Sequence, residues 1–319
     1  MKLHQLQYFV SVAEQGSIRS AALRLGVSPT AVSKSLLELE RDVETSLFTR
    51  SSSGIALTPA GSELLVHARL MLCQLQRARA DLAQHRHIGG KLSIGATAWV
   101  SWSLLPLAVN RFRALRPDVQ LDIFEVVGTR HSGLRDGSLD MTIGLDPPET
   151  IRQELASRRL FAYHAAVVSR LGHPAAQNDC IAALAECSWV MSRSVEELNA
   201  PFLQELEKLQ EDATGNAANV ARIHYARSLS SVLALVEATD MLTLCPWPLL
   251  ETNLMRGRFQ AIPVHHELPE HFTSILTRRN DPPGALAQLF ITCFLAVCEA
   301  STTTTDEVLR RIMRTVEFL

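Results

Sequence analysis

The sequence predicts an α/β protein with an all-α N-terminal part, and three observations predict it. Residues 17–36 have the pattern of two short helices joined by a glycine turn. A stripe of apolar residues repeats at helical spacing through residues 61–82, which indicates one long helix. From Lys91 onward, short apolar segments alternate with helical ones, which is typical of α/β units. The 319 residues, 47% of them hydrophobic, are enough for more than one domain.

The helix pair in residues 17–36 is built around its turn. Gly26 permits a positive φ there, and Ala22 is small where two helix backbones cross closely. The apolar seam between the helices is formed by Leu25, Val27, Val32 and Leu36. Ser28 can cap the second helix, with Pro29 in its first turn, where a missing N–H costs nothing. An ordinary helical hairpin packed in a core is the alternative interpretation.

The second helix of the pair carries polar groups near its start. With the seam pointing inward, Thr30, Ser33 and Lys34 face outward, which is the geometry by which a recognition helix enters a DNA major groove. Residues 3–13 have the spacing of a preceding helix. Residues 47–57 contain two short strand-like segments around a Ser-Ser-Ser-Gly turn, and this pattern fits the wing of a winged helix-turn-helix.

A long helix is predicted from Pro59 to about His87. Its apolar residues alternate steps of three and four for three heptads, which is the pattern of a coiled-coil seam. The predicted dimer seam consists of Leu64, Ala68, Met71, Leu75, Ala78 and Leu82. A two-fold dimer formed through this seam would present two recognition helices to a palindromic operator. The alternative is that the stripe packs on its own domain.

The remaining residues have the pattern of an α/β domain that follows a hinge at Gly89-Gly90. Predicted strands cover residues 91–96, 119–127, 141–144, 160–168, 222–225 and 241–245, with helical segments between several of them. The tail from Ser301 to Leu319 ends in an amphipathic segment. This segment fits either a helix packed on the surface, which we favour, or a contact with a partner.

The N-terminal pattern resembles that of LysR-type transcriptional regulators. The resemblance is carried by Leu6 to Ser17 (LQYFVSVAEQGS), by the helix pair, and by Leu39-Glu40, Leu47-Phe48-Thr49-Arg50 and Leu57-Thr58-Pro59-Ala60-Gly61. It implies a winged helix-turn-helix DNA-binding domain (1–58, helix-turn-helix at about 18–37), a linker and dimerisation helix (59–88), a two-lobed α/β effector domain resembling periplasmic binding proteins (89–300) and a C-terminal extension (301–319). Lobe I would comprise residues 91–163 and 267–299, and lobe II residues 164–266.

The resemblance implies DNA contacts from the recognition helix and the wing. The expected residues are Ser28, Pro29, Thr30, Ser33, Lys34, Arg50 and Ser53. The sequence departs from the family's usual pattern, because Pro29 replaces a common glutamine and Ser53 a common arginine. Leu37 and Glu38 also lie where basic residues are frequent. Each lost cation removes one phosphate contact, so we expect a shallower salt dependence of DNA binding than for a basic relative.

The resemblance also implies a small-molecule site in the cleft between the two lobes. The expected effector-binding residues are Thr97, Trp99, Val100, Ser101, Gly128, Thr129, Met191 and Ser228. Free N–H groups and hydroxyls in residues 97–101 would suit a carboxylate or sulfonate, and Trp99 would suit an aromatic ring. We therefore expect an anionic effector, which can also carry an aromatic ring. The alternatives are that Trp99 is a core aromatic and that Arg130, a candidate anion partner, is a solvated surface residue.

Charge and composition agree with this division of the chain. The net charge is −2, but residues 1–90 carry ten basic and seven acidic side chains, whereas the remainder carries 21 basic and 26 acidic ones. A phosphate-binding surface therefore belongs to the N-terminal part. No apolar run is expected to span a membrane, and residues 1–7 lack the apolar core of a signal peptide. Six scattered cysteines fit a reducing compartment, so we expect a cytoplasmic protein.

Other classes of function find little support in the sequence. It contains no G-x-S-x-G, P-loop, G-x-G-x-x-G or H-E-x-x-H motif, which argues against an enzyme. The pairs His85/His87 and His265/His266 lack further ligands at established spacings, so no metal or cofactor is expected. The alternative function is a thiol-based redox-sensing regulator of the same family that uses Cys180 and Cys187. These cysteines lie at opposite ends of a predicted two-turn helix, which a disulfide would melt.

The resemblance implies several partners. They are double-stranded DNA, a small-molecule effector, RNA polymerase, and further copies of the chain in a homodimer or a tetramer made of two dimers. Binding of the effector in the cleft would change the geometry of the lobes or of the dimer. The spacing of the recognition helices on the operator would change with it, which couples the two sites.

Overall fold

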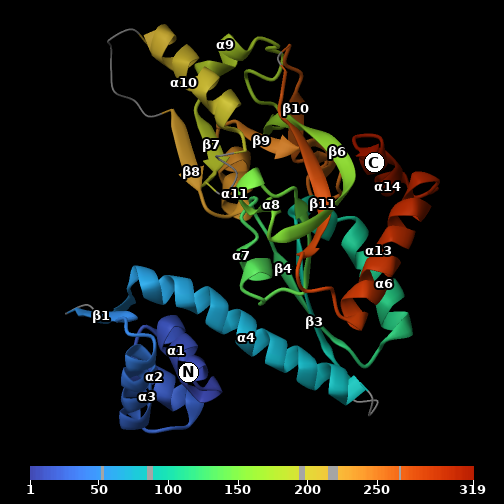
Figure 1. Cartoon of the computed structure of the whole chain (residues 1–319). Helices are drawn as coiled ribbons and strands as arrows, with labels where there is room; N and C mark the ends of the chain where they lie inside the picture. Colours follow the sequence, from blue (N-terminus) through green and yellow to red (C-terminus); the bar gives the residue numbers. More distant parts are fainter. Residues whose placement is uncertain (52–53, 85–88, 194–197, 215–221, 266) are drawn as a thin grey trace. The chain divides into compact units, whose positions relative to one another are not determined.

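The computed structural model describes residues 1–51, 54–84, 89–193, 198–214, 222–265 and 267–319 (Figure 1). It divides the chain into two compact units. The first unit comprises Met1–Lys91 and Ser132–Asp140, and the second comprises Leu92–His131 and Met141–Leu319. The predicted helix-turn-helix lies in the first unit, and all of the predicted effector-binding residues lie in the second.

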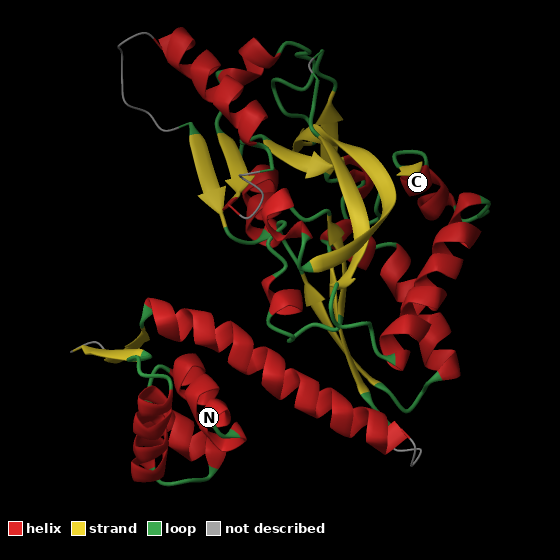
Figure 2. Ribbon diagram, in the orientation of Figure 1, coloured by secondary structure: helices red, strands yellow, loops and turns green. Residues whose placement is uncertain are grey.

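The first unit consists of helices and one short hairpin (Figure 2). Its elements are α1 (Leu3–Gln15), α2 (Ile18–Leu25), α3 (Pro29–Asp42), β1 (Phe48–Ser51), β2 (Gly54–Leu57), α4 (Pro59–Gln84) and, from the later segment, α7 (Ser132–Arg135). Gly26 ends α2 at a φ of 67°, in the left-handed region that glycine adopts without strain. Ser28 caps α3, because its hydroxyl accepts a hydrogen bond from the Ala31 N–H at 3.1 Å. The predicted turn and cap are confirmed.

The core of this unit joins the helices to the hairpin. Phe9 and Leu39 are completely buried in it, and the Phe9 ring lies against the Phe48 ring of β1 with centroids 5.3 Å apart. The strands β1 and β2 pair antiparallel along their full length. Gly61 is needed at the start of α4, since a Cβ there would lie 2.1 Å from the backbone oxygen of Leu47. The wing and the long helix are thus anchored on one core.

The apolar stripe of α4 is divided between this core and the solvent. Ala68 is completely buried in the core, and Leu64 packs half-buried against it. Of the other predicted seam residues, Leu75 is half-buried, Met71 and Ala78 are exposed, and the side chain of Leu82 lies outside the described part. Ala68 is therefore not available to a partner chain, which corrects the prediction that the whole stripe forms a dimer seam. For the exposed part of the stripe, the seam stays a prediction.

The second unit is built on an eight-stranded sheet in the order β10-β6-β11-β5-β3-β4, with β9 and β12 also paired to β6. The strands are β3 (Lys91–Ala96), β4 (Gln120–Glu125), β5 (Met141–Leu145), β6 (Leu155–Arg170), β9 (Thr243–Pro246), β10 (Phe259–Ile262), β11 (Glu270–Arg278) and β12 (Glu317–Phe318). A separate parallel pair is formed by β7 (Trp189–Ser192) and β8 (Ile223–Ala226). The predicted strands are present, whereas β7, β10, β11 and β12 were not predicted.

The long strand β6 runs through both lobes of this unit. Residues 155–164 pair with β11, whereas residues 165–168 pair with β9 and residues 167–170 with β10. The change of partner occurs between His164 and Ala165. One continuous strand therefore connects the two lobes of the predicted α/β domain.

The helices of the second unit cover the sheet (Figure 2). They are α5 (Ala98–Ser101), α6 (Leu104–Leu115), α8 (Glu149–Arg152), α9 (Ile181–Ala185), α10 (Ala200–Thr214), α11 (Leu229–Ala238), α12 (Trp247–Leu250), α13 (Ala285–Thr302) and α14 (Glu307–Met313). By length and a mean hydropathy of 1.6, α13 is long and apolar enough to cross a membrane, contrary to the expectation from the sequence. However, its residues Phe290 and Phe294 are completely buried in the main core, and Phe290 lies against Phe112 of α6. It is thus a core helix of this unit.

The C-terminal extension packs on the second unit. Ile312 of α14 is completely buried in the main core, and Val308 and Val316 pack against the same core. The two-residue strand β12 pairs antiparallel with β6, and the Phe318 ring lies edge-on to Phe161 with centroids 5.4 Å apart. The favoured prediction of a packed helix is confirmed, and the extension also adds an edge to the sheet.

Candidate functional sites

The start of α3 presents small polar side chains and a lysine to solvent. Pro29, Thr30 and Lys34 are exposed, and Ser33 is half-buried. The hydroxyl of Ser28 is already engaged by the cap of the helix. Thr30 and Lys34 are therefore the exposed side chains at the start of α3 that remain free to bind a ligand.

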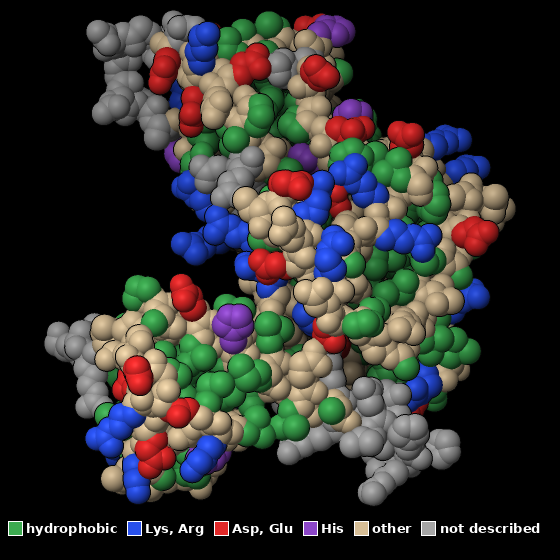
Figure 3. All heavy atoms as spheres, in the orientation of Figure 1, with side chains coloured by type: hydrophobic (Ala, Val, Ile, Leu, Met, Phe, Trp, Pro, Cys, Tyr) green, Lys and Arg blue, Asp and Glu red, His purple; other side chains and the backbone are tan. Residues whose placement is uncertain are grey.

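Two arginines of the first unit are paired with acids. Arg24 lies 3.1 Å from Glu14, which also lies 3.4 Å from Arg69, and Glu38 on α3 accepts a hydrogen bond from Gln5 at 3.4 Å. Figure 3 shows blue and red side chains interspersed over the visible face of this unit. Two of the predicted DNA contacts, the side chain of Arg50 and the whole of Ser53, lie outside the described residues. The shallow salt dependence expected from the sequence stays a prediction.

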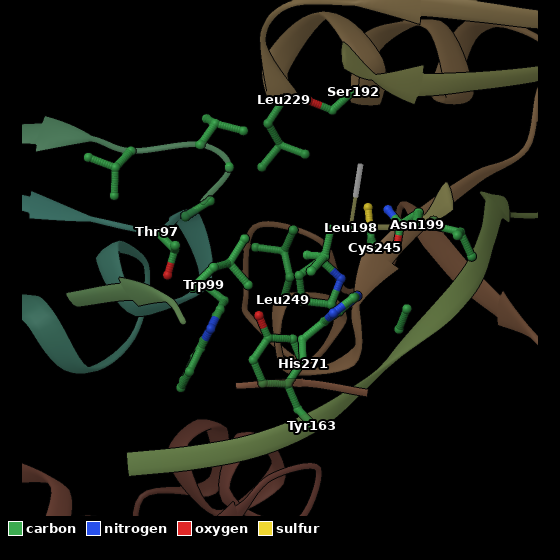
Figure 4. A pocket seen from close by; sticks show the side chains of 18 of the residues that line it. Thr97, Trp99, Tyr163, Ser192, Leu198, Asn199, Leu229, Cys245, Leu249 and His271 are labelled. Carbon is green, nitrogen blue, oxygen red and sulfur yellow. The ribbon is translucent and has the colours of Figure 1, made fainter. Parts of the chain in front are cut away.

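The second unit contains a pocket with about 750 Å³ of empty space, its open mouth included. Its apolar wall is formed by Ala98, Trp99, Val126, Val127, Leu145, Tyr163, Ala165, Leu198, Leu229, Leu244, Cys245, Pro246 and Leu249, and the other lining residues are Thr97, Glu125, Gly128, Ser192, Asn199 and His271. These residues come from the ends of β3, β4, β5 and β7, from the middle of β6, and from β9, β11 and the helices between them. In Figure 4, Thr97 and Trp99 lie on one side of the pocket, and Leu198, Asn199 and Cys245 lie on the other.

Three of the predicted effector-binding residues line this pocket, namely Thr97, Trp99 and Gly128. The others do not. Val100 is completely buried in the main core, Met191 is buried in the second core cluster, and Ser228 caps α11 through the Ser231 N–H at 3.2 Å. Ser101 and Thr129 are half-buried outside the pocket lining. The residues next to two of them, Ser192 and Leu229, line it instead.

Trp99 is both a core aromatic and a pocket wall. Its side chain is only 1% exposed, and its ring lies edge-on to Phe161 and Tyr163 with centroids 5.5 and 5.9 Å away. Its indole N–H donates a hydrogen bond to the Thr273 hydroxyl at 3.2 Å. The position of the ring is therefore fixed by the core, and very little of its surface is left for a ligand.

Burial favours the neutral form of three ionisable groups that line the pocket. Burial, with His164 as a second cause, lowers the pKa of His271 to about 4, so its ring is neutral at pH 7. Burial also raises the pKa of the Tyr163 hydroxyl, and it raises that of the Cys245 thiol to about 12. None of the described lining residues is Lys or Arg, and Glu125 is the acid among them. Arg130 is exposed and does not line the pocket, so the predicted anion site has no cation here.

Sequence reasoning missed the side of the pocket that β6 and β11 supply. Tyr163 and His271 are paired in register on these antiparallel strands, and their rings lie 5.9 Å apart. The available signal was a histidine near the start of the segment after Pro269, which mixes apolar residues with Thr and Ser. Asn199, just before α10, had no such signal.

The cysteines of the redox alternative lie at the two ends of α9, which spans Ile181–Ala185. Cys180 is exposed, and Cys187 is half-buried. Burial, followed by the nearby Glu186, raises the pKa of the Cys187 thiol, which lowers its thiolate fraction and its reactivity. Among the described residues, no cluster of three or more His, Cys, Asp or Glu side chains could hold a metal ion.

Comparisons with protein families match both units. Residues 3–62 match the bacterial regulatory helix-turn-helix protein, lysR family, and residues 85–299 match the LysR substrate binding domain. The chain belongs to the LysR family. It combines a LysR-type helix-turn-helix domain with a two-lobed α/β substrate-binding domain, as the sequence predicted.

Curated relatives in the LysR family are transcriptional regulators. The regulator TdcA of Escherichia coli is 25% identical over 270 residues, which cover 84% of this chain and 84% of TdcA. The regulator GltR of Bacillus subtilis is 34% identical over 123 residues, which cover 39% of this chain and 42% of GltR. These relatives are consistent with the role of a transcriptional regulator.

Solved structures of full-length LysR-type regulators share the fold. CbnR, a LysR family transcriptional regulator, has a TM-score of 0.62 at 19% identity, covering 93% of this chain and 99% of CbnR. A full-length OxyR variant from Pseudomonas aeruginosa has a TM-score of 0.60 at 21% identity, covering 92% of this chain and 94% of the OxyR chain. CbnR has also been solved in complex with its target DNA, with a TM-score of 0.60.

Proposed function

We propose that this LysR-type transcriptional regulator binds an operator through α3 and that a small-molecule effector in the pocket of the second unit controls this binding. The observation that carries the proposal is the pocket itself, because residues from many separate strands and helices of both lobes line it. A ligand there touches both lobes, so its binding free energy depends on how the lobes are arranged. The exposed Thr30 and Lys34 are the groups that would reach DNA.

The working form of the regulator is a homodimer, or a tetramer made of two dimers, in the cytoplasm. The exposed part of the α4 stripe, including Met71 and Ala78, would supply contacts between the copies. Two copies of α3 related by a two-fold axis would bind the two half-sites of a palindromic operator. At the promoter, the DNA-bound regulator would act on RNA polymerase. The thiol-based alternative has less support, because the raised pKa of Cys187 disfavours the reactive thiolate.

The experiment is selection of bound duplexes from a random DNA pool by the full-length chain. The expected result is enrichment of sequences with two related half-sites in inverted orientation. Lys34→Ala should lose this enrichment, whereas Lys208→Ala, which removes an exposed lysine of α10 in the second unit, should keep it. Failure of the unmodified chain to enrich any sequence would contradict the proposed function.

A further inference from the structure

Four polar atoms on the wall of the pocket have no hydrogen-bond partner within the described residues. They are the Thr97 Oγ1, the Ser192 Oγ, the Asn199 Oδ1 and the His271 Nδ1. Each of these atoms is buried from solvent. Buried polar atoms in folded proteins are nearly always hydrogen-bonded, because leaving one unsatisfied costs free energy. Four such atoms around one pocket therefore indicate the groups that a ligand satisfies.

The four atoms come from separate parts of the second unit. Thr97 precedes α5, Ser192 ends β7, Asn199 precedes α10 and His271 lies on β11. In Figure 4 they are distributed around the space, with Ser192 and His271 on opposite sides. A ligand held by several of them at once must carry more than one hydrogen-bonding atom, and the apolar wall must cover the rest of its surface.

None of these four groups carries a charge at neutral pH. The two hydroxyls and the amide are uncharged, and the buried His271 ring is in its neutral form. The described lining residues include no Lys or Arg to balance an anion, and the acid Glu125 would repel one. A carboxylate moved into this apolar pocket would lose its hydration without gaining a cationic partner, which is strongly unfavourable.

The polar atoms also specify which hydrogen bonds a ligand must offer. The Asn199 Oδ1 is only an acceptor, so the ligand has to donate an O–H or N–H to it. The hydroxyls of Thr97 and Ser192 can donate to a carbonyl oxygen of the ligand. A primary amide offers an N–H donor and a carbonyl acceptor on one uncharged group, and an alcohol offers both roles on one oxygen.

We propose that the effector of this regulator is an uncharged, largely apolar molecule with an amide or hydroxyl group, and not a carboxylate anion. The proposal rests on the proposed function, since it names the chemical class of the ligand of the same pocket. It replaces the expectation of an anionic effector that the sequence raised. An aromatic ring in the effector remains compatible with the proposal, because Trp99 is among the residues that line the pocket.

The experiment compares acids with amides of the same shape. Isothermal titration of the full-length chain at pH 7.5 uses the pairs benzoate and benzamide, and hexanoate and hexanamide. The expected result is that the tighter-binding pair favours the amide by roughly tenfold or more, because the acid must shed the hydration of its charge. Equal or tighter binding of the acids would overturn the proposal, and so would the absence of saturable binding by both amides.

Two substitutions assign the binding to this pocket. Leu229→Trp fills the space from the first turn of α11, and it should abolish amide binding. Leu235→Trp, at a 39% exposed position of the same helix outside the pocket lining, should retain it. Should Leu229→Trp fail to fold, Leu198→Trp fills the pocket from another lining position. Amide binding that survives a folded pocket-filling variant would overturn the proposal.

A third substitution tests the electrostatic argument directly. Glu125→Gln removes the acid from the lining, so the preference for amide over acid should narrow by roughly threefold. An unchanged preference would count against the role of charge. If the acids bind tightly and Leu229→Trp abolishes their binding, the proposal of an uncharged effector is overturned. The proposed function then stays intact. The duplex selection tests that function independently, because it requires no effector.

Discussion

The helix α3 and the pocket of the second unit differ in how deeply their candidate binding side chains are buried. Thr30 and Lys34 of α3 are exposed and lie outside the core, so they can be changed without loss of packing. Trp99 and His271 are buried, and Trp99 belongs to the main core of its unit. We therefore expect DNA binding and stability to be separable in the first unit, and ligand binding and stability to be coupled in the second.

Replacement of Trp99 by alanine is expected to have the largest effect on stability. The side chain is almost completely buried and contacts two aromatic rings, so its loss should cost about 3–5 kcal/mol of the free energy of unfolding. All four tryptophans, at 99, 102, 189 and 247, lie in the second unit. Urea unfolding followed by the fluorescence of the remaining three therefore reports on that unit. A decrease of less than about 1 kcal/mol in the free energy of unfolding would contradict the coupling of ligand binding and stability in this unit.

Replacement of Lys34 by alanine should affect only DNA binding. Loss of one contact to a base or phosphate costs about 1–3 kcal/mol, so the affinity for the selected duplex should fall roughly tenfold to hundredfold. Because the side chain is exposed, the free energy of unfolding should stay within about 0.5 kcal/mol of the unmodified value. Fluorescence anisotropy measures the affinity, with Lys208→Ala as the control of equal charge change. A Lys34→Ala chain that binds the duplex as tightly as the control contradicts the role of α3.

His271 should make the stability of the second unit fall in mild acid. Its pKa is lowered to about 4 in the folded protein from 6.5, so protonation favours the unfolded chain as the pH falls from about 6.5 to 4. Between pH 7 and pH 5 this contribution amounts to about 2 kcal/mol. The side chain of His271→Gln cannot titrate. Between pH 7 and pH 5, the free energy of unfolding of this variant in urea should therefore fall by that much less than the free energy of the unmodified chain. His224→Gln, at an exposed position of β8, is the control, and a His271→Gln profile parallel to it would refute the buried neutral ring.

Replacement of Phe318 by alanine should have the smallest effect. The ring is 48% exposed, and it contributes one edge-on contact with Phe161, worth about 1 kcal/mol. Leu319→Ala removes a side chain of similar exposure without a ring contact, while its backbone N–H still donates to the Leu160 oxygen. The difference between these two variants in thermal unfolding measures the contact of the extension with the sheet. Identical unfolding temperatures of the two variants would mean that the Phe318 ring contributes nothing to stability.

The sequence predicted the first unit better than the pocket because the signals of the first unit are local. Gly26, Ser28 and Pro29 specify the turn and the cap within four residues, and the structure places them so. The division of the α4 stripe was missed, because the burial of Ala68 depends on the rest of the first unit's core. Periodicity shows that a stripe is apolar, and it does not show which surface covers it.

The residues that line the pocket were predicted in part. In two cases the lining residue is the sequence neighbour of the predicted one. Along β7, successive side chains point to opposite faces, so Met191 enters a core cluster and its neighbour Ser192 enters the pocket. At the start of α11, Ser228 is occupied as the cap and Leu229 lines the pocket. His271 comes from a strand far away in the sequence, and only the register of β11 on β6 brings it to the site. Such pairing carries no local signal.

The most direct test of the regulator's central property is the affinity for the selected duplex at rising concentrations of the pocket ligand. Anisotropy titrations of the full-length chain with benzamide or hexanamide, whichever binds the pocket more tightly, are expected to show a shift in the midpoint of DNA binding. Leu229→Trp should remove the shift, and Leu235→Trp should keep it. A DNA affinity that is unchanged at saturating ligand would contradict the account, because a ligand that binds two states equally shifts no equilibrium between them.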